Sequence, residues 1–82
     1  MQFVLTERFT IKGRDVFSFG IPDTMHPEAA FALRSSKHVL LNGSQRAVER
    51  VDVQTSLSNR YLALMSFTDP NIAKVGDTVT FM

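Results

Sequence analysis

The chain has 82 residues, no cysteine and a formal net charge of +1. This length predicts one domain over residues 1–82, and the lack of cysteine excludes disulfides and thiolate zinc sites. So small a basic surplus argues against strong non-specific binding to nucleic acid.

No run approaches the ~18 apolar residues of a membrane span. The first eight residues lack the basic segment and apolar core of a signal peptide. We therefore expect a soluble, cytoplasmic protein. Its stability must come from apolar burial, and the hydrophobic content of 44%, with seven phenylalanines, is sufficient for that.

The first part of the chain has the alternation of a β-strand. Its apolar residues of one parity are Phe3, Leu5, Phe9 and Ile11, with Glu7 interrupting the pattern. Gly13 then permits a tight turn, because glycine tolerates positive φ. Extended structure resumes over residues 16–19 and runs to Gly20.

Residues 21–27 are expected to form a loop, because two prolines remove backbone donors. The segment 27–34 fits two structures. Pro27 with alanines behind it suits the first turn of a helix. A strand would place Ala29, Phe31 and Leu33 on one face. The neighbouring strands and the short run favour the strand, with the helix as the open alternative.

The pair Asn42-Gly43 predicts a tight hairpin, because both residues tolerate the positive φ that such a turn needs. The return strand spans residues 44–53, but its apolar parity slips after Val48. We expect a bulge near Glu49-Arg50, which would help a small barrel to bend. A loop follows at residues 55–59.

The segment Tyr61 to Phe67 is apolar on both faces, which predicts a central or covered strand. If its odd residues fill the interior, Leu62 and Leu64 point outward, or the reverse. An outward apolar pair could be covered by the chain itself, or could dock a partner or a second copy. Residues 69–71 form a turn.

The last strand follows Val75-Gly76, and Asp77 is expected to hydrogen-bond backbone donors of the turn rather than to act in catalysis. Both ends of the chain therefore lie in predicted strands. Pairing them would remove exposed edges, which predicts an all-β, closed antiparallel barrel of about six strands.

Three segments carry a resemblance to a known family: Phe9-x-Ile11-x-Gly13-Arg14-x-Val16-Phe17, Val51-x-Val53, and Ile72-Ala73-x-Val75-Gly76-Asp77-x-Val79. Together they resemble the second domain of translational GTPases over about residues 3–82. The resemblance implies a six-stranded antiparallel β-barrel. In the full factors this barrel helps to hold the acceptor end of transfer RNA or contacts the ribosome, so it also implies RNA contact.

The chain departs from that family at two places. Asp15 stands where a second glycine is usual, and Pro27-Glu28 lies nearest to an expected internal Gly-Asp step. It also has no Gly-x-x-x-x-Gly-Lys-Ser/Thr segment, so we expect it to bind no nucleotide by itself.

Catalytic and metal-binding patterns are weak. His26 and His38 have no cysteine partner, and no serine lies in a Gly-x-Ser-x-Gly elbow. His26 with Glu28, or Asp69 with the asparagine after Pro70, offers at most two local metal ligands, whereas zinc needs three or four. We expect a protein that is not an enzyme and holds no cofactor or metal. An enzyme site assembled between subunits is a third, less favoured hypothesis.

Two binding hypotheses follow. The favoured one is a non-catalytic binding or adaptor module that acts through a protein partner or its own oligomer, with Leu62 and Leu64 as contact residues. The alternative is an RNA-contacting module that uses Arg14, Arg46, Arg50 and Arg60, with Tyr61 stacking on bases. Nearby acidic residues favour a solvated mixed-charge surface instead. Steep weakening with salt would distinguish phosphate contacts from an apolar interface.

Overall fold

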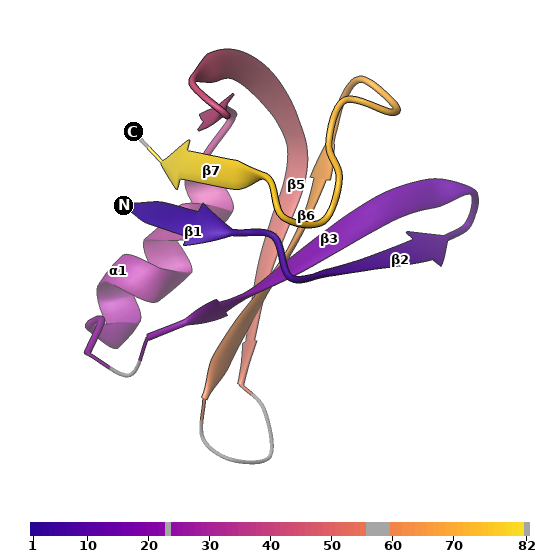
Figure 1. Ribbon diagram of the computed structural model, residues 1–82. Helices are drawn as coiled ribbons and strands as arrows, with labels where there is room; N and C mark the ends of the chain where they lie inside the picture. Colours follow the sequence, from indigo (N-terminus) through magenta and orange to yellow (C-terminus); the bar gives the residue numbers. More distant parts are fainter. Residues whose placement is uncertain (23, 56–59, 82) are drawn as a thin grey trace.

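The computed structural model describes residues 1–22, 24–55 and 60–81. Their strands are β1 (Gln2–Val4), β2 (Glu7–Ile11), β3 (Arg14–Ile21), β4 (His38–Leu41), β5 (Ser44–Thr55), β6 (Tyr61–Phe67) and β7 (Thr78–Phe81). A helix α1 (Pro27–Ala32) and a 3-10 turn η1 (Leu33–Ser35) precede β4. All neighbouring strands are antiparallel, in the order β1-β7-β4-β5-β6-β3-β2. The sheet curls into a half-barrel (Figure 1).

The all-β architecture is confirmed, but the expected closed barrel of about six strands is wrong. The chain bends between β1 and β2, so the two strands take different partners. The Leu5 N–H donates to the Asp77 carbonyl beside β7, whereas the Thr6 N–H donates to the Ser18 carbonyl in β3. In the described part of the chain the sheet therefore has seven strands, with β1 and β2 as its two ends.

The two ends of the chain lie side by side, as predicted. β1 pairs with β7, and Phe3 lies opposite Val79. The Phe3 ring stacks on Phe19 at a centroid distance of 4.5 Å and meets Phe81 edge-on at 5.8 Å. These three rings connect both terminal strands to β3 in the centre of the core.

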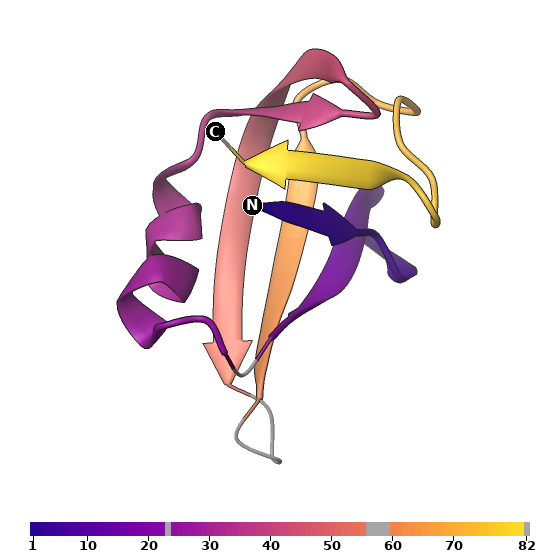
Figure 2. The same cartoon turned by 60° about the vertical axis from the view of Figure 1, so that its left-hand side comes forward.

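Residues 27–34 are helical, so the prediction of a strand is wrong. The His26 side chain caps α1, because its Nδ1 accepts the Glu28 N–H at 3.2 Å. Pro27 costs nothing at the first helical position, where its N–H would have no helical partner. Ala30 and Leu33 are buried, a spacing of three that fits one face of a helix. α1 lies beside β5, on the side of the molecule where the N- and C-termini are found (Figure 2).

Several local predictions are confirmed. Asn42 and Gly43 have φ of 50° and 88° in the β4–β5 hairpin. The register of β5 against β6 shifts between Val48 and Arg50, where the bulge was expected. β6 is central, between β5 and β3. The Asp77 carboxylate accepts the N–H of Lys74 at 3.0 Å.

The turn at residues 69–71 is also present, and Asn71 has a φ of 61°. Of the predicted loop at 55–59, only residue 55 is among the described residues. β5 ends at Thr55, and residues 56–59 lie outside the described residues.

Candidate functional site

The outer face of β6 carries the two leucines that the sequence singled out. Opposed residues of antiparallel strands share a face, and Leu64 lies opposite Ser18 on β3 and Asp52 on β5. Leu62 lies opposite Gly20. The odd residues Ala63, Met65 and Phe67 are buried, whereas both leucines are half-buried. Of the two orientations left open, the structure therefore has the odd residues inside.

The same outer face continues onto β3 and β2. Phe9 on β2 lies opposite Val16 on β3, and Ile11 lies opposite Arg14. The exposed fractions of Phe9 and Ile11 are 42% and 50%. Exposed apolar side chains that cluster on one face indicate an interaction surface more strongly than scattered ones do.

A groove of about 230 Å³ crosses this face. We call it the outer groove. Its lining residues are Ile11, Lys12, Arg14, Val16, Glu49, Arg50, Asp52, Leu64, Met65 and Ser66. They come from β2, β3, β5 and β6 and from the turn after β2, so the groove exists only because the sheet brings these strands together.

Two ion pairs border the outer groove. The Arg14 guanidinium pairs with the Glu49 carboxylate, and Arg50 Nε lies 2.9 Å from Asp52 Oδ2. The bulge in β5 helps to build this rim, because an extra residue re-aims side chains next to it. Both pairs are largely solvent-exposed, so each contributes only about 0–1 kcal/mol to stability. Their main effect is to neutralise both arginines locally.

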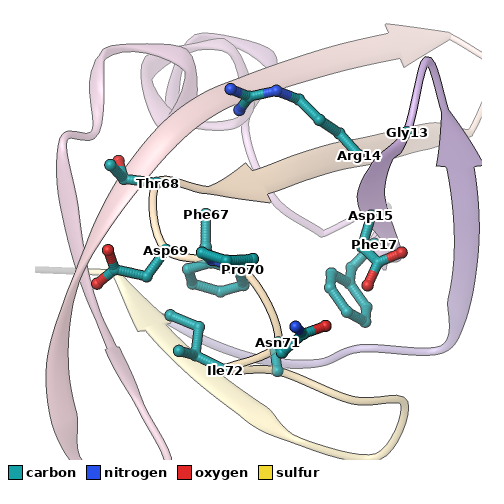
Figure 3. Close-up of a pocket in the computed structure, with 11 residues that line it drawn as sticks. Gly13, Arg14, Asp15, Phe17, Phe67, Thr68, Asp69, Pro70, Asn71 and Ile72 are labelled. Atoms are coloured by element: carbon teal, nitrogen blue, oxygen red, sulfur yellow. The ribbon is translucent and has the colours of Figure 1, made fainter.

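A second hollow, of about 450 Å³, lies between the start of β3 and the loop after β6 (Figure 3). We call it the hairpin pocket. Phe17 and Phe67 approach edge-on there, with ring centroids 6.3 Å apart. Figure 3 shows Phe67 and Ile72 on one side, and Phe17 and Asp15 on the other. Both rings are buried, so the pocket presents little aromatic surface to a ligand.

The structure brings together three of the seven sequence-predicted binding residues. Arg14, Arg50 and Leu64 line the outer groove. Leu62 lies on the same face but outside the groove lining.

Three predicted residues lie elsewhere. Arg46 is opposite Val39 on β4, away from the outer groove. Arg60 is exposed and directly precedes β6. Tyr61 is half-buried, and its ring meets Phe31 of α1 edge-on at 5.5 Å. The predicted group of four arginines and one aromatic residue therefore does not form one surface.

The sequence pattern does not predict Ile11 and Val16 as groove residues, because the apolar residues of the first segment form one continuous alternation. Phe3 and Leu5 are buried as expected, but Phe9 and Ile11 are exposed. The bend after Leu5 changes which parity faces inward. Glu7, the charged residue that interrupts the apolar pattern, was the available signal for this change.

The chain matches no protein-family model, no curated protein and no solved structure. The resemblance to the second domain of translational GTPases therefore stays a prediction. Within the described residues there is no cluster of three metal-ligating side chains, and every buried side-chain polar atom there has a hydrogen-bond partner. No helix in that part of the chain is long and apolar enough to cross a bilayer.

Proposed function

We propose that this chain is a non-catalytic binding module that docks a protein partner on the outer groove. The observation that carries the proposal is the apolar face formed by Ile11, Val16 and Leu64 inside a rim of paired charges. An apolar side chain of a partner could bury itself there without separating either ion pair of the rim, which would otherwise weaken binding.

The paired rim favours a protein over RNA as the partner. A phosphate group would have to compete with Glu49 for Arg14 and with Asp52 for Arg50. The resemblance to translation-factor barrels keeps RNA contact as the alternative. In that case Arg46 and Arg60 would have to act from parts of the surface separate from Arg14 and Arg50, which gives less local field than one basic patch.

The contribution of Leu64 can be estimated from its size. Fully burying a leucine side chain contributes about 1.5–3 kcal/mol, and Leu64 is already half-buried in the free chain. Covering the remainder would contribute about 1 kcal/mol, so replacement by a polar residue of similar size should weaken binding several-fold or more.

The test is affinity capture from native lysate with the wild-type chain, Leu64→Gln and Val4→Gln. Val4 is a matched control, because it is 51% exposed on β1 at the other end of the sheet. Circular dichroism first checks that both variants fold. We expect partners that survive nuclease treatment, bind Leu64→Gln several-fold more weakly, and bind Val4→Gln like wild type.

Two results would contradict the proposal. Loss of every partner after nuclease treatment would favour the RNA-contacting alternative, and a steep decrease of binding with salt would agree with it. Equal binding of wild type and Leu64→Gln would exclude the outer groove as the docking site.

A further inference from the structure

β2 is an exposed edge of the sheet. It stands at one end of the strand order and pairs only with β3 in the described part of the chain. All five of its residues are exposed, although Phe9 and Ile11 are apolar. An exposed edge strand presents unpaired N–H and C=O groups to another chain. Proline and bulges protect such edges in many proteins, but the strand Glu7–Ile11 contains no proline and pairs with β3 in an unbroken register.

The hairpin after β2 determines which backbone groups are free. Lys12 and Gly13 have φ of 52° and 79°, as in a type I′ turn, which is flanked by a hydrogen-bonded pair. Hydrogen-bonded and non-hydrogen-bonded pairs alternate along an antiparallel ladder. Ile11 belongs to the hydrogen-bonded pair beside the turn, so Phe9 belongs to the next one. The N–H and C=O of Arg8 and Thr10, which lie between, therefore point away from β3.

We propose that two copies of this chain associate through their β2 edges, antiparallel about a two-fold axis at Phe9. In this arrangement Arg8 of each copy exchanges backbone hydrogen bonds with Thr10 of the other. Phe9 then lies opposite Phe9 of the second copy, on the outer face. The two curled sheets become one continuous sheet, as in other cases of strand addition.

The charges of β2 select this register. Backbone hydrogen bonds between the two copies need N–H and C=O groups that point away from β3, and these occur at every second residue. Arg8 can therefore oppose only Arg8, Thr10 or Lys12 of the other copy. Arg8 opposite Arg8 or Lys12 places like charges together, which is destabilising. Arg8 opposite Thr10 avoids this, pairs all five residues of the strand and joins two aromatic rings.

The chain's low charge also favours a second copy as the occupant. With a net charge of +1, two copies repel each other little. Five paired residues form a small interface, so we expect a weak dimer that needs about 0.1–1 mM chain to be well populated.

Cysteine substitution tests the register, because the wild-type chain has no cysteine. The variants are Phe9→Cys, Arg8→Cys, Thr10→Cys and Val4→Cys, each oxidised mildly and examined on a non-reducing gel. In a dimer of one variant, a disulfide forms only if the cysteine lies opposite its own copy, because only directly opposed residues come within the required Cα distance of about 4.4–6.8 Å. In the proposed register Phe9 is the residue that opposes itself. Val4 is exposed on β1, the other end of the sheet, and controls for random collision.

We expect Phe9→Cys to form a covalent dimer at least several-fold faster than the other three variants. A faster reaction at Arg8→Cys or Thr10→Cys would overturn the register, and equal rates at all four positions would overturn the edge contact itself. Sedimentation of the wild-type chain should show a dimer at high concentration. Thr10→Pro, which removes one outward N–H, should weaken that dimer, and a wild-type chain that stays monomeric would refute the proposal.

The edge contact and the outer groove can be separated experimentally. Leu64→Gln in the Phe9→Cys background should leave the cross-linking rate unchanged, because Leu64 lies on β6, with β3 between it and β2. Loss of the cross-link in that double variant would mean that the outer groove holds the two copies, which overturns association through the β2 edge.

Discussion

Replacing Phe19 removes the ring that connects both terminal strands to β3. Phe19 is 1% exposed, and its ring lies 4.5 Å from Phe3 and 5.8 Å from Phe81. Truncation of a core phenylalanine to alanine costs about 3–5 kcal/mol. A domain of 82 residues has a total stability of about 4–12 kcal/mol, so Phe19→Ala should lose a large part of it. Phe19→Leu keeps most of the volume and should lose only about 1–2 kcal/mol.

Urea denaturation followed by circular dichroism measures these losses. Phe9→Ala is the matched control, because Phe9 is 42% exposed on β2 and should change the free energy of unfolding by about 0.5 kcal/mol or less. The slope of that free energy against urea should stay constant across the series, since the folded shape is retained. A Phe9→Ala loss equal to that of Phe19→Leu, or no loss in Phe19→Leu, would refute the reasoning.

Three further stability predictions concern the turns and can be measured by the same denaturation. Gly76 has a φ of +97° with open space around it, so Gly76→Ala should cost about 1–2 kcal/mol through backbone strain alone, whereas Gly20→Ala should be nearly neutral. Asn42 has a φ of 50°, and its side-chain oxygen accepts the Thr78 N–H at 2.9 Å. Asn42→Ala should therefore cost about 1–2 kcal/mol of unfolding free energy, and a neutral result would contradict a stabilising role of Asn42 in this turn. Asp77→Ala removes the acceptor of the Lys74 N–H and should cost about 0.5–1.5 kcal/mol. A loss below that of Gly20→Ala would count against the capping role.

Local chemistry was readable in advance where it depends on a few neighbouring residues. Asn42-Gly43 adopts positive φ because those residue types tolerate it, whatever surrounds them. The turn-capping role of Asp77 is equally local, since its acceptor and the Lys74 donor are three residues apart. The same reasoning failed at residues 27–34, where a short run fitted two periodicities. The His26 cap and the burial of Ala30 and Leu33 favour the helix.

The outer groove could be predicted only in part. The two-faced apolar pattern of residues 61–67 indicated that one set of side chains points outward, and Leu64 does line the groove. Its partners Ile11 and Val16 could not be identified, because that required knowing that β3 lies between β2 and β6. The Arg14–Glu49 pair joins residues far apart in the chain, and no local sequence pattern predicts such a pair.

The sequence by itself determined that this protein is built from antiparallel strands, where its hairpins turn, and that its two ends lie together. The strands and turns depend on local backbone preferences and alternating burial, which a single chain displays directly, whereas the pairing of the two ends follows from the cost of exposed strand edges. Only the tertiary structure decided that the sheet stays a half-barrel with β2 as a free edge. The reason is the bend between Leu5 and Glu7, where the Leu5 N–H donates to the segment before β7 and the next N–H, that of Thr6, donates to β3. This change of partner turns Phe9 and Ile11 outward, and so creates both proposed binding surfaces.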